Sequence, residues 1–229
     1  MLSRLLFVFF LVALSGCSTY IKIPSSESLK RSDIKLQNNQ EKFFSGLFLT
    51  DDSQGNRLRY AIQFVDPQKL RVELYPTTSF YQLGLLIVDN QRYKFVNSSE
   101  NQLEVGEFSP LVLQDKIGLE LSVPQLISAV VQKIPSDISS YVSYTDNSNN
   151  LYVFSDDKSF IGVFDQITLT PKEFFYFNND DLLAKIIISK TIPDCKMQVM
   201  VPKYDFKVEV ECLMFKNDKR PQDSRFELD

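Results

Sequence analysis

The chain has 229 residues, of which 44% are hydrophobic and nineteen are phenylalanine, which suits one domain with a sizeable core. Its formal net charge is −4 and its basic residues are scattered, which argues against the concentrated positive face of a nucleic-acid-binding protein. Histidine is absent, and this excludes the usual general base, the commonest metal ligand and the Ser-His and Cys-His nucleophile pairs.

Residues 1–16 have the three parts of a secretory signal peptide. Arg4 is the positive n-region, residues 5–14 are the apolar h-region, and Ser15 and Gly16 are small residues before a cleavage site. The apolar run is shorter than the roughly 20 residues that a membrane-spanning helix needs. We therefore expect residues 1–16 to be removed on export.

Cys17 directly follows this signal, and Leu14-Ser15-Gly16-Cys17 resembles the lipobox of bacterial lipoproteins. The resemblance implies that Cys17 carries acyl chains that anchor the protein in membrane lipid. Ser18 in place of aspartate implies the outer membrane of a Gram-negative bacterium, with the protein facing the periplasm. The alternative is an ordinary cleaved signal followed by an incidental cysteine.

Residues 17–34 are predicted to be a lipidated tether. Ser25 or Ser26 can cap a short helix that continues through Leu29 and Leu36.

From residue 43 the apolar period changes to two, which predicts strands joined by turns rich in Asp, Asn, Gly and Pro. The predicted strands of this half span residues 43–50, 58–65, 69–75, 83–89 and 91–96. Together they predict an antiparallel meander.

Residues 75–81 connect two of these strands and carry Phe80 and Tyr81 near the tip. Exposed aromatic side chains on a membrane-tethered protein suggest contact with the membrane, and inward packing is the alternative. Phe80 and Tyr81 are our candidates for a membrane-contacting loop.

One helix interrupts the strands. Ser122 can cap it, Pro124 fits its first turn, and apolar residues recur at helical spacing until Pro135 stops it. The stripe includes Leu126 and Val130, and the sheet is the only large partner available for it.

Strand-like patterns resume at Leu151. They continue over residues 160–169, 174–177, 182–189, 195–201 and 206–215, which brings the predicted sheet to about eleven strands. Residues 216–229 are charged and are predicted to be a polar, frayed tail.

Cys195 and Cys212 are the two cysteines left after Cys17, in an oxidising compartment. If Lys203-Tyr204 is a two-residue turn, facing positions sum to 407, so that Cys195 faces Cys212 on the apolar side of a hairpin. The count from the turn makes them a non-hydrogen-bonded pair, with Cα atoms ~4.5 Å apart. We predict a disulfide; a slipped register with two buried thiols is the alternative.

Chemical motifs are scarce. The aspartate pairs at residues 51–52, 156–157 and 180–181 each lie between predicted strands, where tight turns select aspartate. No metal cluster, phosphate-binding loop or activated nucleophile is visible, so we expect no metal, no cofactor and no enzyme activity. In residues 174–177 both strand faces are apolar, which predicts a strand buried under the helix or, alternatively, the wall of a hydrophobic cavity.

The order of these features resembles the LolB-like outer-membrane lipoproteins of the LolA/LolB-like lipoprotein-carrier fold. The resemblance is carried by SGLF at residues 45–48, LRVELYP at 70–76, GLELSVPQL at 118–126 and Ile134-Pro135. It implies a half-open barrel that holds lipoprotein acyl chains and passes them to the outer membrane without a cofactor. The family has an exposed leucine and a glycine after the proline; here Thr77 and Thr78 stand there, so Phe80 or Tyr81 would substitute.

We therefore expect a mainly β protein in which residues 35–215 form one antiparallel half-open barrel of about eleven strands, with short helices packed over its concave face. Its leading function is to bind acyl chains of lipoproteins or similar hydrophobic ligands and to assist their delivery to the membrane. The alternative is a structural or assembly lipoprotein with a filled core that docks onto an envelope protein complex. The candidate ligand-lining residues are Ile62, Phe64, Leu74, Leu85, Ile87, Leu126, Val130 and Phe175.

Overall fold

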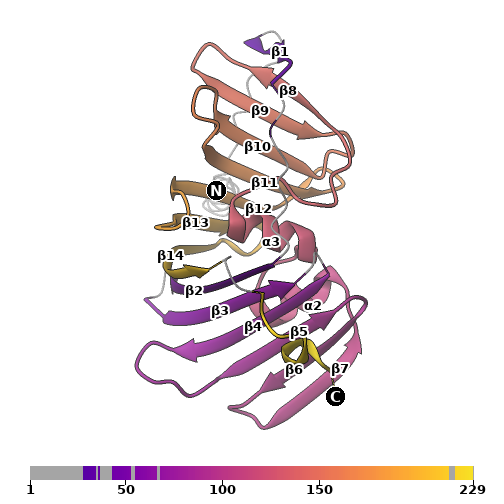
Figure 1. Cartoon of the computed structure of the whole chain (residues 1–229), viewed down its shortest axis with the longest axis vertical. Helices are drawn as coiled ribbons and strands as arrows, with labels where there is room; N and C mark the ends of the chain where they lie inside the picture. The colour runs from indigo at the N-terminus through magenta and orange to yellow at the C-terminus, as the bar shows by residue number, and fades with distance from the viewer. Residues whose placement is uncertain are drawn as a thin grey trace, which may run out of the picture.

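The computed structural model describes residues 28–34, 36, 43–52, 55–65, 68–216 and 220–228. In this part of the chain, fourteen strands form one antiparallel sheet, and two α-helices, α2 (Pro110–Ile117) and α3 (Val123–Val131), accompany it (Figure 1). The strands are β1 (Lys30–Ser32), β2 (Phe43–Asp52), β3 (Arg57–Val65), β4 (Lys69–Pro76), β5 (Gly84–Asp89), β6 (Arg92–Asn97), β7 (Gln102–Glu107), β8 (Tyr141–Thr145), β9 (Asn150–Ser155), β10 (Phe160–Asp165), β11 (Pro171–Asn178), β12 (Asp181–Lys190), β13 (Lys196–Val201) and β14 (Phe206–Lys216).

The sheet consists of two meanders joined side by side. Strands β2 to β7 form one meander and β8 to β14 the other, and β14 pairs with β2 in the middle of the sheet. Strand β1 extends the sheet beyond β8, so β1 and β7 are its two edges among the described strands. Because these edges do not pair, the sheet stays open, as the prediction of a half-open barrel requires, although it has fourteen strands rather than about eleven.

Side chains alternate between two faces of the sheet, and we call the face that packs against α2 and α3 the inner face. The main hydrophobic core lies between this face and the helices. Two smaller clusters, around Phe175 and around Phe226, lie on the outer face. The one-layer sheet therefore buries apolar side chains on both sides.

Helix α3 begins and ends on specific hydrogen bonds. Ser122 Oγ accepts from the Gln125 backbone N–H at 3.2 Å, while the Gln125 side chain accepts from the Ser122 backbone N–H at 2.9 Å, forming a capping box. Gln132 closes the helix in the left-handed region, with φ 58°. Eight of its nine residues are buried, so α3 is enclosed rather than packed along one stripe. Among the described residues, no helix combines the length and apolar character needed to cross a membrane.

Two predictions at the ends of the chain are wrong. Residues 30–32 are the short edge strand β1, paired with β8, and not part of a helix; residues 17–27 of the predicted lipidated tether lie outside the described residues. The C-terminal segment includes a short 3₁₀ turn (Asp223–Phe226), and Phe226 packs on the outer face against Val65 and Ile87. Residues 220–228 are therefore not a frayed tail, because one buried aromatic side chain holds them to the sheet; in Figure 1 this yellow segment lies across β4 to β6.

The last hairpin has the predicted register. Val199 faces Val208 and Met197 faces Val210, and a disulfide joins Cys195 to Cys212 with their Cα atoms 5.1 Å apart. The turn, however, is a 3₁₀ turn over Pro202–Tyr204 closed by Asp205, and not a two-residue turn. The longer turn changes which pairs share hydrogen bonds: the Cys212 N–H donates to the Cys195 carbonyl at 2.8 Å, so the predicted non-hydrogen-bonded pair is wrong.

Candidate ligand-binding site

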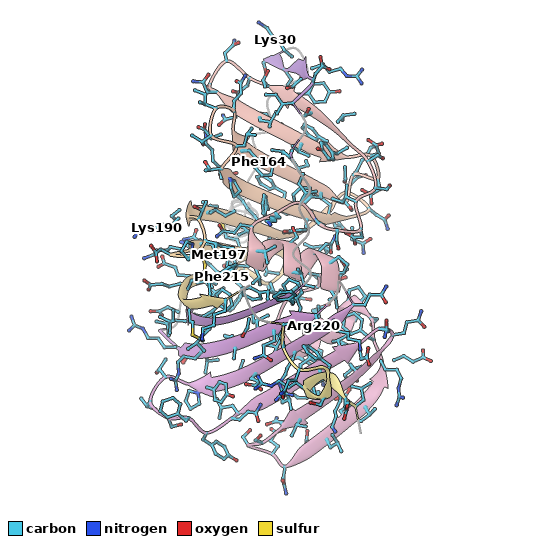
Figure 2. All side chains as sticks on the ribbon, viewed as in Figure 1. Lys30, Phe164, Lys190, Met197, Phe215 and Arg220 are labelled. Carbon is cyan, nitrogen blue, oxygen red and sulfur yellow. A yellow bond between two sulfur atoms is a disulfide. The ribbon has the colours of Figure 1, made fainter. Side chains whose placement is uncertain are left out.

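An apolar cavity of about 210 Å³ lies between α3 and the middle of the sheet. Its walls come from β2, β3, β4, β12, β13 and β14, together with α3 and the end of α2. Figure 1 shows α3 beside the middle strands of the sheet, and Figure 2 labels Met197, a lining residue on β13. Thr50, Asn56 and Tyr60 are its lining residues with polar side-chain groups, and none of the lining residues is charged. The lining residues are Phe48, Thr50, Asn56, Leu58, Tyr60, Ile62, Val72, Ile117, Leu119, Leu126, Ala129, Val130, Ile186, Met197, Val199, Phe206, Val208 and Val210.

The mouth of the cavity lies at one end of the strands. Asn56 and Phe206 are exposed lining residues, and they flank the β2–β3 and β13–β14 connections. Registers Val208↔Asp52 and Leu58↔Pro76 bring the β4–β5 connection to the same end of the sheet. The mouth and the loop with Phe80 therefore share one end of the molecule.

The roof of the cavity is α3, and buried polar contacts hold it in place. Ser128 Oγ lies 3.1 Å from the Tyr176 hydroxyl on β11, inside the core. The Gln132 side chain donates to the Lys190 carbonyl at 3.3 Å and accepts from the Ile192 N–H at 3.2 Å. Burial raises the pKa of Tyr176, whose hydroxyl therefore stays neutral and able to share a hydrogen bond.

Helix α2 forms one side of the mouth and is held by more exposed contacts. Leu113 is its buried residue. Lys116 Nζ lies 2.6 Å from Glu104 on β7, and the Gln114 side chain bonds to the Tyr204 hydroxyl across the mouth. The hydrogen bond from Lys116 lowers the pKa of Glu104, so the Lys116–Glu104 pair is an ion pair at neutral pH.

Three of the eight predicted lining residues, Ile62, Leu126 and Val130, do line the cavity. Phe64 and Leu74 share the inner face but lie outside the lining: Phe64 stacks on Phe44 at 5.5 Å in the core.

The structure places Leu85, Ile87 and Phe175 on the outer face, so they do not reach the cavity. Their strands are apolar on both faces, and alternation alone does not tell which face turns inward. Sequence reasoning missed the contribution of the last hairpin, although it placed Met197, Val199 and Val208 on one apolar face, which was a usable signal.

Phe80 and Tyr81 lie in the β4–β5 connection with 88% and 61% of their surfaces exposed. The Arg59 guanidinium lies 4.9 Å from the Phe80 ring centre and donates to the Pro76 carbonyl at 2.9 Å and to the Ser79 carbonyl. Arg59 thus braces a loop that presents an aromatic side chain to solvent. Cys17 lies outside the described residues.

The aspartate pairs serve turns and ion pairs. Asp157 accepts from Ser159 at 3.0 Å, and Asp51 pairs with Arg57 at 2.8 Å. Within the described ranges, no group of three or more metal-ligating side chains comes together.

The protein is therefore of the mainly β class: an open antiparallel sheet has helices over one face and an apolar cavity beneath them. No family model matches the chain, and no curated protein matches it. A solved DUF1329 family protein from Desulfovibrio piger aligns over 84% of this chain and 92% of its own, with a TM-score of 0.53 and 11% identity. At this identity the likeness establishes a shared fold.

Two further solved structures align less closely. One is a domain described as outer membrane lipoprotein-sorting, from Vibrio parahaemolyticus (TM-score 0.49, 8% identity, 82% of this chain and 91% of that one). The other is a LolA superfamily protein from Nitrosomonas europaea (TM-score 0.49, 11% identity, 82% and 91% coverage).

Proposed function

We propose that this protein is an outer-membrane-anchored lipoprotein that binds an acyl chain of a lipoprotein, or a similar hydrophobic ligand, in the cavity under α3 and assists its delivery to the membrane. The observation that carries this proposal is the uncharged, mostly apolar lining of a cavity that opens at one end of the sheet. Alkyl burial contributes about 25 cal/mol per Å² without a directional partner. Such a function needs neither a cofactor nor covalent chemistry.

Acyl binding is tested with an environment-sensitive fluorescent fatty acid and the exported chain carrying Cys17→Ser, which keeps all described residues. We expect saturable fluorescence enhancement and displacement of the probe by a synthetic lipopeptide that carries one acyl chain. The Ala129→Leu variant fills the cavity from α3 and is expected to lose the signal. Ala61→Leu, on the outer face of β3 and outside the lining, is the matched control. No uptake by the Cys17→Ser chain would contradict the proposal.

The anchor proposal rests on the lipobox resemblance at Cys17. Metabolic labelling with radioactive palmitate is expected to label the full chain and not the Cys17→Ser variant, and fractionation is expected to place the labelled protein in the outer membrane. Label on the Cys17→Ser variant, or labelled protein in the inner membrane, would contradict it.

The β4–β5 connection is proposed to touch the membrane through Phe80, with Tyr81 beside it. An aromatic ring that is 88% exposed beside the mouth would bring the cavity close to lipid. Flotation of the exported Cys17→Ser chain with liposomes is expected to fall when Phe80→Ser is added. Ile167→Ser is the matched control, because Ile167 is 78% exposed but lies in the β10–β11 connection at the opposite end of the strands. Equal losses in both variants would contradict a specific role.

A second candidate is the structural or assembly lipoprotein. On the inner face of β10 and β11, Phe160, Phe164, Phe174 and Tyr176 are at most 4% exposed, so this half of the core is filled. This function is favoured if a pull-down returns stoichiometric envelope proteins while the acyl probe is ignored.

A further inference from the structure

We infer that the cavity admits one alkyl chain at a time, so that its ligand is a single-chain amphiphile and not the whole set of acyl chains of a lipoprotein. The inference rests on the proposed function, because it concerns the same cavity. The size, rigidity and polarity of the site define the class of ligand.

The volume of the cavity limits the number of alkyl chains that it can hold. The cavity measures about 210 Å³. An apolar cavity of roughly 150 Å³ holds one benzene molecule, while pockets for larger ligands span about 300 to 1,000 Å³. A segment of one alkyl chain fits the space under α3, and two chains side by side do not.

The roof does not widen the cavity without breaking buried hydrogen bonds. Displacing α3 from the sheet would separate Ser128 from Tyr176, and Gln132 from the connection that follows β12. A buried polar group left without its partner bears the full cost of its desolvation. The eight buried residues of α3 would also lose their packing.

The inner end of the cavity is closed by aromatic rings. The rings of Phe44 and Phe48 lie over Gly46, and a Cβ atom at Gly46 would lie 2.8 Å from a Phe48 ring atom. Phe215 packs on Phe44 at 5.0 Å between ring centres, behind Phe48. Cys212 faces Phe48 on the neighbouring strand and is tied to β13 by the disulfide. Because this wall closes the inner end, the part of an alkyl chain that does not fit in the cavity would extend out through the mouth.

At the mouth, the chain would run past Ile117 and Leu119, at the end of α2. The helix is held there by the 2.6 Å pair between Lys116 and the half-exposed Glu104, and an adjustment of this partly exposed pair costs less than a displacement of α3. Because the lining has no charged group, a charged head group would remain in water outside Asn56 and Phe206. Recognition would therefore depend on the number of chains and not on the head group.

The test is native mass spectrometry of the exported Cys17→Ser chain with four probes: palmitate, 1-palmitoyl lysophosphatidylcholine, dipalmitoyl phosphatidylcholine and a tripalmitoyl lipopeptide. We expect a 1:1 adduct with each single-chain probe, and at least tenfold weaker binding of the two- and three-chain probes. Because the head group is expected to remain in water, palmitate and the lysolipid should bind alike.

Three variants test whether the size of the cavity limits binding to one chain. Ala129→Leu is expected to weaken single-chain binding at least tenfold, while Ala61→Leu leaves it unchanged. Leu126→Ala enlarges the cavity and is expected to reduce the ratio of single-chain to multi-chain binding. This ratio is measured on the folded fraction of Leu126→Ala, so the test holds even if Ala129→Leu does not fold. Equal binding of the tripalmitoyl and single-chain probes would overturn this inference and leave the proposed function standing. Failure of all four probes would overturn both.

Discussion

Ser128 on α3 and Tyr176 on β11 share a hydrogen bond inside the core, with 3.1 Å between their hydroxyl oxygens. It connects the roof of the cavity to the half of the sheet that does not line it. Ser128 also donates to the Lys133 carbonyl, so one small side chain holds both the end of α3 and the sheet. The cavity therefore depends on the filled half of the core for its shape.

Tyr176→Phe removes this contact with little change of volume. We expect the free energy of unfolding to fall by about 1 to 3 kcal/mol, because the Ser128 hydroxyl loses a buried partner. Urea denaturation measures the change. Tyr204→Phe, on the exposed β13–β14 turn, is the comparison and is expected to have a smaller effect. An unchanged midpoint for Tyr176→Phe would mean that the bond does not hold the roof.

Two strands carry the same arrangement of phenylalanine rings over a glycine. Phe44 and Phe48 cover Gly46 in β2, and Phe160 and Phe164 cover Gly162 in β10. A Cβ atom at Gly162 would lie 2.7 Å from a Phe164 ring atom and 3.1 Å from a Phe160 ring atom. Overpacking of this kind costs about 1 to 3 kcal/mol, and we expect this loss for Gly46→Ala and Gly162→Ala.

Gly84→Ala is the matched control, because the nearest neighbours of a Cβ atom at Gly84 lie at 3.7 Å, an ordinary contact distance. Thermal and urea unfolding compare the three variants. If Gly84→Ala is as destabilised as the other two, the rings are not the cause.

The disulfide between Cys195 and Cys212 closes a loop with a sequence separation of 17 residues. Removing it is expected to lower the free energy of unfolding by about 2 to 4 kcal/mol, because the unfolded chain gains freedom. The double variant Cys195→Ala with Cys212→Ala is compared with the wild type in urea. Reduction of the wild-type protein by dithiothreitol should produce a similar loss. A loss below about 0.5 kcal/mol would show that the pairing of β14 with β2 holds the hairpin without the bridge.

Asp165, in the β10–β11 connection, gives a specific pH dependence. The Thr168 N–H, Lys172 and the Ile167 N–H lower the pKa of Asp165 to about 2. Its pKa is lower in the folded than in the unfolded chain, so its contribution to stability is present above about pH 3.9 and is lost as the pH falls toward 2. Asp165→Asn should remove this part of the acid sensitivity. Identical curves for variant and wild type between pH 2 and 5 would contradict the assignment.

The hairpin register and the disulfide were predicted from a turn centred on Lys203 and Tyr204 together with the apolar face shared by β13 and β14. The observed turn is longer but has the same centre, so the facing pairs are unchanged. The alternation of apolar and polar residues did not reveal β7, because Leu103 and Val105 are exposed on this edge strand and leave no buried face to detect. Helix α2 was missed because it buries Leu113 among half-exposed neighbours. Leu85 and Ile87 were placed in the site because Leu86 and Val88 beside them are equally apolar, and only the three-dimensional position of α3 shows which pair turns inward.

We propose above that an alkyl chain lies between α3 and the sheet. The most direct measurement is photocrosslinking of the exported Cys17→Ser chain with a palmitate that carries a diazirine near its methyl end, followed by peptide mapping. We expect label on lining residues of β3, α3 and β13, such as Ile62, Leu126 and Val199, and loss of this label in Ala129→Leu. Label spread over the outer face around Phe175, or unchanged by Ala129→Leu, would contradict it.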